Sequence, residues 1–280
     1  MVTGSLRAHR CRWRAGPPSS SPVRRFTIAP DRIRDGRVAF DRAESRHLRR
    51  VLRLKPGDTV IAADGAGHDF TVRLEDVGET VTGTVLGVAR RDAESPLRIT
   101  LVQSVPKGDK MEAIVRAATE LGVARVVPVT TERTIVTLEP GRWRERARRW
   151  QRVAKEAAKQ CGRGVIPPVD VPRPLGEFLA LDEPAELRLC LWEGAAGQGQ
   201  GGGQALPFGT TLTQSLPPTL PQGASIHLLI GPEGGLSRQE VESGRAVGWR
   251  VIGVGPRILR TETAGPAIIA VLQSKFGDMD

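Results

Sequence analysis

The chain lacks the features that mark several common classes of protein. Its 280 residues contain only three cysteines, Cys11, Cys161 and Cys190, without the spacing of metal ligands or of a disulfide framework. No stretch approaches the roughly 18 consecutive apolar residues of a membrane-spanning helix. The basic, then Pro/Ser-rich start has no apolar core of the kind that secretory signals carry. We therefore expect a cytoplasmic protein with no metal site and no membrane contact, and a disordered tail over residues 1–23.

Basic residues outnumber acidic ones, 41 Lys and Arg against 31 Asp and Glu, so the formal net charge is +10. This excess, with a pI near 10.6, favours a polyanion such as nucleic acid as the partner. Basic side chains crowd two segments, 24–53 and 142–163, and two such patches are suited to clamp a folded RNA by its phosphates. The residues expected to contact RNA are Arg24, Arg25, His47, Arg49, Arg50, Arg53, Lys107 and Arg163. For His47, a lone histidine among arginines, simple exposure is the alternative.

Residues 24–93 have the pattern of a small β domain. Short runs rich in Thr, Val and Ile, such as "DTVIAADG" and "DFTVRLEDV", predict strands, and "DGAGH" between them predicts a hairpin turn. One helical patch, "ESRHLRRVLRLKPGD", interrupts the strands and ends at Pro56-Gly57. Many short strands with one helix favour a small β-barrel.

Residues 96–280 alternate between strand and helix patterns. Strands are expected over 98–105, 124–131, 186–193, 225–231 and 249–255, and helices over 110–122, 140–164, 237–248 and 263–276. This alternation predicts an α/β domain with a mostly parallel sheet that is covered on both faces. Residues 194–224 are rich in Gly, Gln, Pro and Thr without periodicity, so we expect a flexible, exposed insertion there.

Two glycine loops follow predicted buried strands. In "LLIGPEGGLSRQE" (228–240), Ser237 and Glu240 form a capping box that begins a helix. The second loop, "GVGPRILR" (253–260), also leads into a helix. Neither loop is a P-loop or a complete dinucleotide fingerprint. Loops at the carboxyl ends of neighbouring parallel strands form one crevice. Glycines allow close backbone approach, and Ile258-Leu259 suit a flat ring, so we predict a pocket for an adenosine-like cofactor.

Several motifs together resemble one known family. "GPEGGLSRQEVE" and "VGPRILRTETA", with "VPKGDKMEAIVRAATELGV", "EAAKQCGRGVIP" and "HLRRVLRLKPGD", resemble the trefoil-knotted methyltransferases of the SPOUT class, of the RsmE type. The resemblance spans about residues 24–276. It implies a knotted C-terminal SPOUT domain, a PUA-like N-terminal barrel and a homodimer. It also implies transfer of a methyl group from S-adenosyl-L-methionine to N3 of a uridine in 16S ribosomal RNA, either naked or in the small ribosomal subunit.

The resemblance also implies roles for individual residues. Arg260 would stabilise the negative charge that spreads onto the uracil carbonyls when N3 loses its proton. Glu262 would orient Arg260 or accept that proton, and a structural ion pair is the alternative for both residues. Glu233 either contacts the cofactor or caps its own loop. The residues expected to bind the cofactor are Leu191, Trp192, Gly231, Pro232, Glu233, Gly234, Gly235, Val254, Gly255, Ile258 and Leu259.

One residue departs from the family pattern. Pro266 is tolerated in the first turn if Thr263 caps the last helix, but it would break the helix if Thr261 is the cap.

Two other functions stay open for the chain. One is a knotted 2′-O-ribose or transfer-RNA methyltransferase, and the other is an RNA-binding ribosome assembly factor without catalysis.

Overall fold

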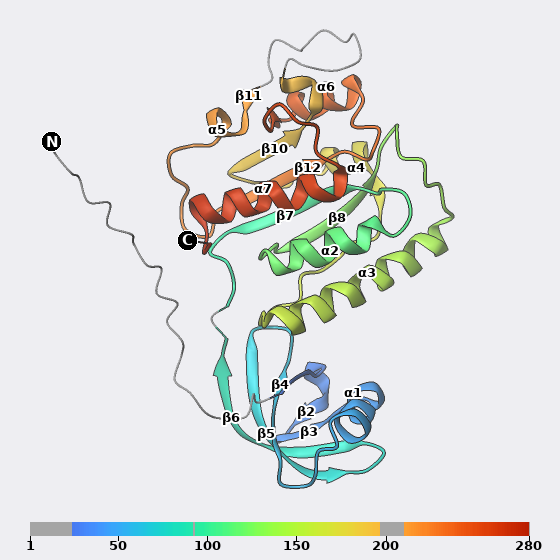
Figure 1. The fold of residues 1–280 in the computed structure, drawn as a ribbon, viewed down its shortest axis with the longest axis vertical. Coiled ribbons are helices and arrows are strands. Elements are labelled where there is room, and N and C mark those ends of the chain that lie inside the picture. Colours follow the sequence, from blue (N-terminus) through green and yellow to red (C-terminus); the bar gives the residue numbers. More distant parts are fainter. Residues whose placement is uncertain (1–23, 92, 197–209, 280) are drawn as a thin grey trace, which may run out of the picture.

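The computed structural model describes residues 24–91, 93–196 and 210–279, which form two sheets with separate cores (Figure 1). The tail predicted for residues 1–23, which includes Cys11, lies outside the described residues. The six-stranded sheet lies in the N-terminal part and the seven-stranded sheet in the C-terminal part. The long helix α3 (Pro140–Cys161) runs from beside the larger sheet to the smaller one (Figure 1).

The N-terminal sheet is the curled sheet of the predicted barrel. Its order is β1-β4-β5-β6-β3-β2, and all pairs are antiparallel except β1 with β4. It wraps around a core that includes Phe26, Phe40, Leu48 and Leu74. The helical patch is a short α-helix followed by a π-helical turn. The elements are β1 (Arg25–Thr27), β2 (Ile33–Arg34), β3 (Arg37–Ala39), α1 (Arg42–Arg46), η2 (His47–Val51), β4 (Thr59–Ala63), β5 (His68–Val77) and β6 (Val81–Arg90).

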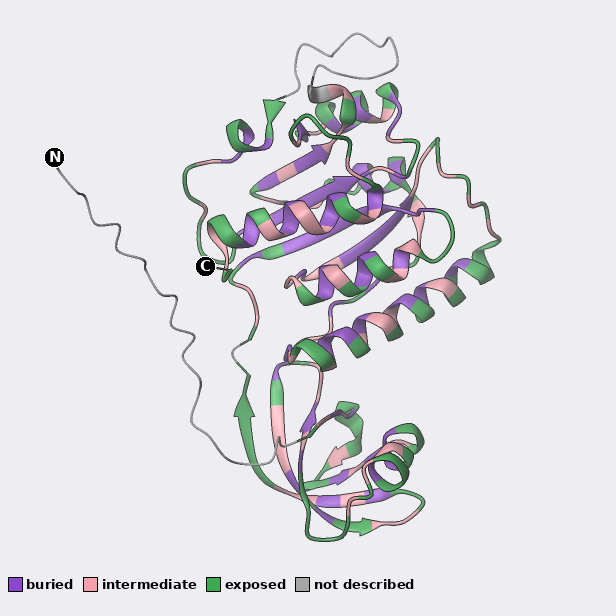
Figure 2. Ribbon diagram, viewed as in Figure 1, coloured by how far each residue is buried: buried purple, intermediate pink, exposed green. Residues whose placement is uncertain are grey.

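The C-terminal sheet is entirely parallel, as the alternation of strands and helices predicts. Its order is β11-β13-β10-β12-β7-β8-β9. Its longer strands are buried over most of their length, whereas the two-residue strands at its edges are not (Figure 2). The strands are β7 (Arg98–Ser104), β8 (Arg125–Thr130), β9 (Arg173–Pro174), β10 (Leu187–Leu191), β11 (Thr210–Thr211), β12 (Ser225–Ile230) and β13 (Arg250–Gly253).

Helices cover both faces of this sheet. Helices α2 (Lys110–Glu120), α3 and α7 (Thr261–Phe276) share one core cluster with the sheet. Helices α4 (Leu175–Ala180) and α6 (Arg238–Ala246) form a second cluster on the opposite face. Strand residues alternate between the two clusters, with Leu101 in the first and Val102 in the second, because successive side chains point to opposite faces. The deep knot remains an expectation from the resemblance.

Part of the predicted insertion is structured, so the expectation of a loose segment was wrong for residues 210–224. Strand β11 pairs with β13, and helix α5 (Leu212–Ser215) begins with a capping box between Thr211 and Gln214. Leu212 and Leu216 are buried in the core. The Thr-x-x-Gln pattern of residues 211–214, with Leu212 inside it and Leu216 after it, was the signal that the composition obscured. Residues 197–209 lie outside the described part.

Pro266 does not break the last helix, so the prediction about its cap was wrong. Arg260 is the N-cap, and α7 runs through Pro266 at its sixth residue. The proline removes the N–H that would bond the carbonyl of Glu262, at a cost of about 3 kcal/mol. Fully buried Ile268, Ile269 and Leu272 lie in the turns that follow. Their packing offsets that cost, since burying one large apolar side chain contributes roughly 1.5–3 kcal/mol.

Two predicted RNA-binding arginines instead join the two parts of the chain. Arg163 is buried, and its guanidinium donates to the Glu94 carboxylate at 2.6 Å and to the carbonyls of Thr119 and Val123. Arg25 donates to Asp69 and to the carbonyl of Arg163, both at 2.7 Å. These contacts use the donors that would face phosphate. The RNA-binding prediction was therefore wrong for Arg163 and Arg25.

We expect Arg163→Ala to destabilise the protein by about 3 kcal/mol, because it leaves two buried carbonyls and a carboxylate without their donor. Urea denaturation measures this free energy of unfolding. Arg37→Ala is the matched control, because the Arg37–Glu75 pair is exposed, with 74% and 40% of the side chains accessible. Its removal should cost less than about 1 kcal/mol. Equal costs for the two variants would contradict the structural role of Arg163.

Candidate active site

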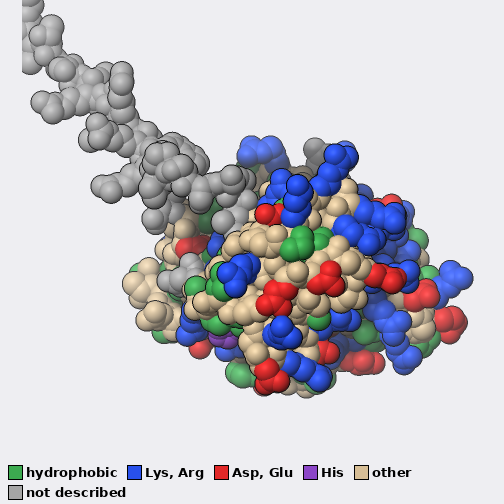
Figure 3. All heavy atoms as spheres, turned by 90° about the horizontal axis from the view of Figure 1, so that it is seen from below, with side chains coloured by type: hydrophobic (Ala, Val, Ile, Leu, Met, Phe, Trp, Pro, Cys, Tyr) green, Lys and Arg blue, Asp and Glu red, His purple; other side chains and the backbone are tan. Residues whose placement is uncertain are grey.

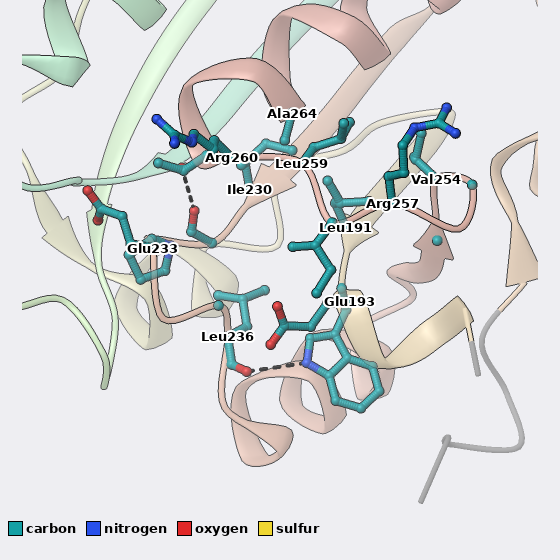
Figure 4. A pocket seen from close by; sticks show the side chains of 18 of the residues that line it. Leu191, Glu193, Ile230, Glu233, Leu236, Val254, Arg257, Leu259, Arg260 and Ala264 are labelled. Carbon is teal, nitrogen blue, oxygen red and sulfur yellow. Dashed lines mark hydrogen bonds between the residues drawn. The ribbon is translucent and has the colours of Figure 1, made fainter. Parts of the chain in front are cut away.

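The main cavity opens at the carboxyl ends of three adjacent strands, β13, β10 and β12, where parallel-sheet proteins place their ligands. It has a volume of about 320 Å³ and is bordered by the loops after these strands and by the start of α7 (Figure 4). Most of the predicted cofactor-binding residues line it, namely Leu191, Trp192, Gly231, Pro232, Glu233, Gly235, Val254, Gly255, Ile258 and Leu259.

The first glycine loop is closed by contacts that only glycine permits. A Cβ atom on Gly231 would stand 3.0 Å from backbone atoms of Gly235 and Leu236, and Gly235 has a φ of +69°. The predicted capping box follows at once, with the Ser237 hydroxyl and the Glu240 carboxylate exchanging bonds with each other's backbone N–H. The loop thus turns sharply from β12 into α6 and leaves its backbone along the cavity.

Gly234 does not line the cavity, which corrects its predicted role. Its carbonyl accepts a hydrogen bond from Arg133 at 2.7 Å. A Cβ atom on Gly234 would meet the Cβ of Arg133 at 3.3 Å. Gly234 therefore faces the loop after β8, and a larger side chain there would not enter the pocket.

A buried hydroxyl connects the two glycine loops. Thr261, the first residue of α7, donates to the carbonyl of Gly231 at 2.7 Å. The same hydroxyl accepts from the amide of Gln103 on β7 at 3.0 Å. Both side chains are buried, so these bonds are shielded from competing water. They fix the start of α7, and with it Arg260, against the loop that holds Gly231.

Apolar side chains form the walls of the cavity. Leu191, Val254 and Leu259 lie on one side in Figure 4, with Ile230 and Leu236 across from them. The Trp192 indole N–H donates to the Leu236 carbonyl at 3.3 Å, which holds its ring at the border of the pocket. Ile258 lies at the mouth with 66% of its surface exposed. Such a slot suits a flat apolar group.

A lysine and two carboxylates form a charged group beside this slot. The ammonium of Lys110 lies 2.9 Å from Glu233 and 3.5 Å from Glu262. The hydrogen bond with Glu233 is the main cause that raises the pKa of Lys110. Burial alone would raise the pKa of Glu233, but the hydrogen bonds from Lys110 and from the Lys107 N–H outweigh it and lower that pKa. All the charges of this pair are therefore present at neutral pH.

Glu262 does not pair with Arg260, which was one of its two predicted roles. The structure pairs it with Lys110, and it is not among the residues that line the cavity. Its Oε2 atom is buried and accepts no hydrogen bond within the described residues. Glu233 does bond within its own region, to Lys107 and Lys110, and it also lines the cavity.

The two arginines of the second loop lie on opposite sides of the cavity mouth. Arg260 lies on the side of Glu233, whereas Arg257 points away on the other side (Figure 4). Both are exposed, and neither side chain has an ion pair or hydrogen bond within the described part of the chain. Arg260 is therefore free to turn toward a ligand next to the charged group.

Sequence reasoning missed several residues of the cavity. Lys110, Glu193 and Arg257 are the charged ones, and Ile230, Leu236 and Ala264 are among the apolar ones. Glu193 had a usable signal, because it comes two residues after the end of β10, at the edge where the loops converge. Lys110 had none, because it reaches the site from the first turn of α2, more than 100 residues away from the loops.

The chain matches two family models. Residues 93–273, well over half of the chain, match the RNA methyltransferase domain, and residues 40–84 match the RNA methyltransferase PUA domain. The chain belongs to this family of RNA methyltransferases. The family and the fold class predicted from the motifs are confirmed.

Relatives of this RNA methyltransferase match it over most of its length. Ribosomal RNA small subunit methyltransferase E of Synechocystis sp. is 34% identical over 89% of this chain and 77% of its own length. The protein of that name from Bacillus subtilis is 31% identical over 79% of this chain and 83% of its own. Its solved counterpart from Neisseria gonorrhoeae, bound to S-adenosyl methionine, has a TM-score of 0.78 at 33% identity. That alignment covers 92% of this chain and 100% of the other.

A second solved structure agrees with this result. A methyltransferase from Legionella pneumophila, in complex with the bound cofactor SAM, has a TM-score of 0.78 at 29% identity. It also aligns over 92% of this chain and over its own full length. Both domains of the RNA methyltransferase are therefore included in the similarity.

The remaining residues predicted to contact RNA lie mostly at the surface of this RNA methyltransferase. Arg24, Arg49, Arg50, Arg53 and Lys107 are exposed. His47 is half-buried, and its ring packs edge-on against Phe26 at 5.9 Å between centroids. This packing against Phe26 is a structural role for His47 that requires no contact with RNA.

The described residues contain neither a membrane-spanning helix nor a metal-binding group. No helix there is long and apolar enough to cross a membrane. Across the same residues, no three His, Cys, Asp or Glu side chains are grouped so that they would hold a metal ion.

Proposed function

We propose that this RNA methyltransferase transfers a methyl group from S-adenosyl-L-methionine to N3 of a uridine in 16S ribosomal RNA. The observation that carries the proposal is the cavity formed by three strand-end loops with an unpaired arginine at its mouth. Similarity over the whole length to proteins named ribosomal RNA small subunit methyltransferase E supports the substrate. Two of the solved relatives contain the cofactor.

The cavity fits S-adenosyl-L-methionine in shape and in chemistry. The apolar slot of Leu191, Val254 and Leu259 suits the adenine ring, and glycine backbone on both loops is open to its polar edge. The Lys110–Glu233 pair offers both signs of charge to the amino and carboxylate groups of the methionine part. The cofactor supplies an electrophilic methyl group, so the chain mainly has to position the two reactants.

The residues around Arg260 then act on the uracil. N3 carries a proton that must leave, and the resulting negative charge spreads onto the O2 and O4 carbonyls. Arg260 stabilises that charge because its guanidinium has no competing carboxylate within the described residues. Glu262 is the candidate acceptor of the proton, since its Oε2 atom is buried and its one charged contact in the described chain is the Lys110 ammonium at 3.5 Å. Lys110 holds Glu262 in place.

Three further properties belong to the proposal. The chain divides into an RNA-binding barrel over 24–93 and a methyltransferase domain over 96–280, and it acts in the cytoplasm, where ribosomal RNA is made and assembled. It forms a homodimer. The middle of α7 supports this, because the exposed and half-buried residues between 263 and 274 are uncharged and small or apolar, namely Thr263, Pro266, Ala267, Ala270, Val271 and Ser274. Sedimentation, which returns the mass in solution, tests the dimer, and a monomer mass would exclude it.

Reverse transcription of 16S ribosomal RNA tests the substrate. A methyl group on N3 blocks the Watson–Crick edge, so RNA from the parent strain should give a stop that RNA from a deletion strain loses. Mass spectrometry of the nucleosides separates a base product from a 2′-O-methyl product. A ribose product, or a change confined to transfer RNA, would replace this proposal with the second enzyme function. Calorimetry without saturable cofactor binding would favour the assembly factor.

We expect Arg260→Ala to keep its cofactor affinity while its single-turnover rate falls by roughly 100-fold, the scale for loss of one transition-state charge stabiliser. Isothermal calorimetry and rapid-quench methylation measure the two quantities. Arg257→Ala is the matched control, because it removes an equally exposed arginine from the other side of the mouth. If Arg257→Ala shows the larger rate loss, the assignment of Arg260 is wrong.

We expect Gly231→Ala to weaken cofactor binding at least about tenfold, because its Cβ would press on the backbone at Gly235 and deform the loop. Gly234→Ala should change the affinity less than about threefold, since its Cβ would face Arg133 outside the cavity. Calorimetric titration with S-adenosyl-L-methionine compares the two variants. A stronger effect at Gly234 would show that the loop has another conformation when the cofactor is bound.

A further inference from the structure

Helix α3 carries a row of cationic side chains on one flank. Its 22 residues include eight Lys and Arg against two Glu. The positions 144, 148, 152, 155 and 159 are three or four residues apart, so they lie one above the other on the helix. At 1.5 Å per residue the row is roughly 22 Å long. Another face of the helix is buried against the C-terminal sheet and consists of Trp143, Ala147, Trp150 and Ala154. The row of cationic side chains therefore faces outward.

Most of the row has no partner among the described residues. Arg144, Arg148 and Arg152 are exposed and Lys155 is half-buried, and none makes an ion pair or hydrogen bond within the described residues. We call these four residues the α3 ladder. By contrast, Arg149 on the same helix is paired with Glu112 at 2.5 Å. An unpaired row of charges on a rigid helix repels itself, so it contributes no stability to the fold.

The ladder leads to the barrel. Lys159, one turn beyond Lys155, is bonded to Glu44 of α1 at 3.0 Å and lies over the Phe26 ring. Lys155 itself borders a small cleft between the domains together with Arg25 and Thr27. Helix α1 continues directly into η2, which carries exposed Arg49 and Arg50. Viewed from the barrel end, Lys and Arg side chains are numerous at the surface, with Asp and Glu side chains among them (Figure 3).

We propose that the α3 ladder binds the phosphate backbone of the substrate RNA and extends the basic surface of Arg49 and Arg50 on the barrel toward the methyltransferase domain. Cations spaced by one helical turn along a line match a polyanion strand, whereas a small anion would need donors that converge on one point. The rigid helix holds the RNA at a fixed place relative to the cavity. This inference rests on the proposed function, because it takes ribosomal RNA as the partner.

The test compares two double charge reversals on the same helix. Arg144→Glu with Arg148→Glu changes the ladder, and Arg142→Glu with Arg146→Glu makes the same charge change, with the same spacing, on the opposite flank. Binding to a 16S ribosomal RNA transcript is measured across a salt series. The ladder variant should bind at least about tenfold more weakly at low salt, with a salt slope lower by about 1 to 2, because two phosphate contacts are lost. The control should change less than about threefold.

Three outcomes would overturn the inference. Equal losses in both variants would mean that net charge matters and the ladder does not. An unchanged salt slope in the ladder variant would mean that these residues do not face phosphate. Lost binding only to the assembled small subunit, with transcript binding intact, would assign the ladder to a ribosomal protein. Glutamate is as good a helix former as arginine, so unchanged cofactor affinity and melting temperature should confirm that the variants are folded.

The same samples separate this inference from the proposed function. If the wild-type protein does not methylate 16S ribosomal RNA, the proposed function fails, whatever the binding curves show. If it methylates the RNA and the ladder variant has the same RNA affinity as the wild type, only the ladder fails. Methylation of the ladder variant should recover at RNA concentrations well above its weakened dissociation constant, because no ladder residue lines the cavity.

Discussion

The site depends on one buried hydroxyl. Thr261 joins the amide of Gln103 in the centre of the sheet to the carbonyl of Gly231, and it is also the first residue of α7. The sheet brings the two glycine loops to one edge, and these bonds add a direct connection between the first loop and the start of α7. With them, the start of α7 is fixed against the first loop, and Arg260 projects at the cavity mouth. The exposed arginine is thus positioned by buried polar contacts and not by its own side-chain interactions.

Local patterns predicted the elements of the fold well. Continuous apolar runs marked the strands buried on two faces, and the Ser237–Glu240 capping box marked the start of α6. Predictions failed where a tertiary contact overrode a local preference. Pro266 stays inside α7 because Ile268, Ile269 and Leu272 hold the helix in the core. Residues 210–216 are ordered because Leu212 and Leu216 reach that same core, although the composition of the segment is that of a linker.

Sequence reasoning predicted those parts of the site that follow from the closeness of the strand-end loops. Strand-end loops of a parallel sheet must converge, so most cavity residues of the two glycine loops were found. The partners of the charged side chains were not found. Pairing depends on where distant segments come to lie, and Lys110 reaches Glu233 and Glu262 across 123 and 152 positions of sequence. No local pattern contains that information, which is why Glu262 was expected beside Arg260.

The role of each positive charge depends on whether its side chain has a partner in a distant segment. The Arg163 guanidinium is satisfied within the methyltransferase domain, where it bonds Glu94. Arg25 donates to the carbonyl of Arg163 and Lys159 donates to Glu44, so these two side chains hold the barrel to the methyltransferase domain. Such contacts fix the barrel relative to the cavity. The cations that remain unpaired, on η2 and along α3, are then presented at constant spacing. A basic protein that binds a folded RNA needs both the unpaired and the paired cations. The unpaired cations supply the affinity for phosphate, and the paired cations fix the two domains relative to each other, so that the bound RNA has one nucleotide at the active site.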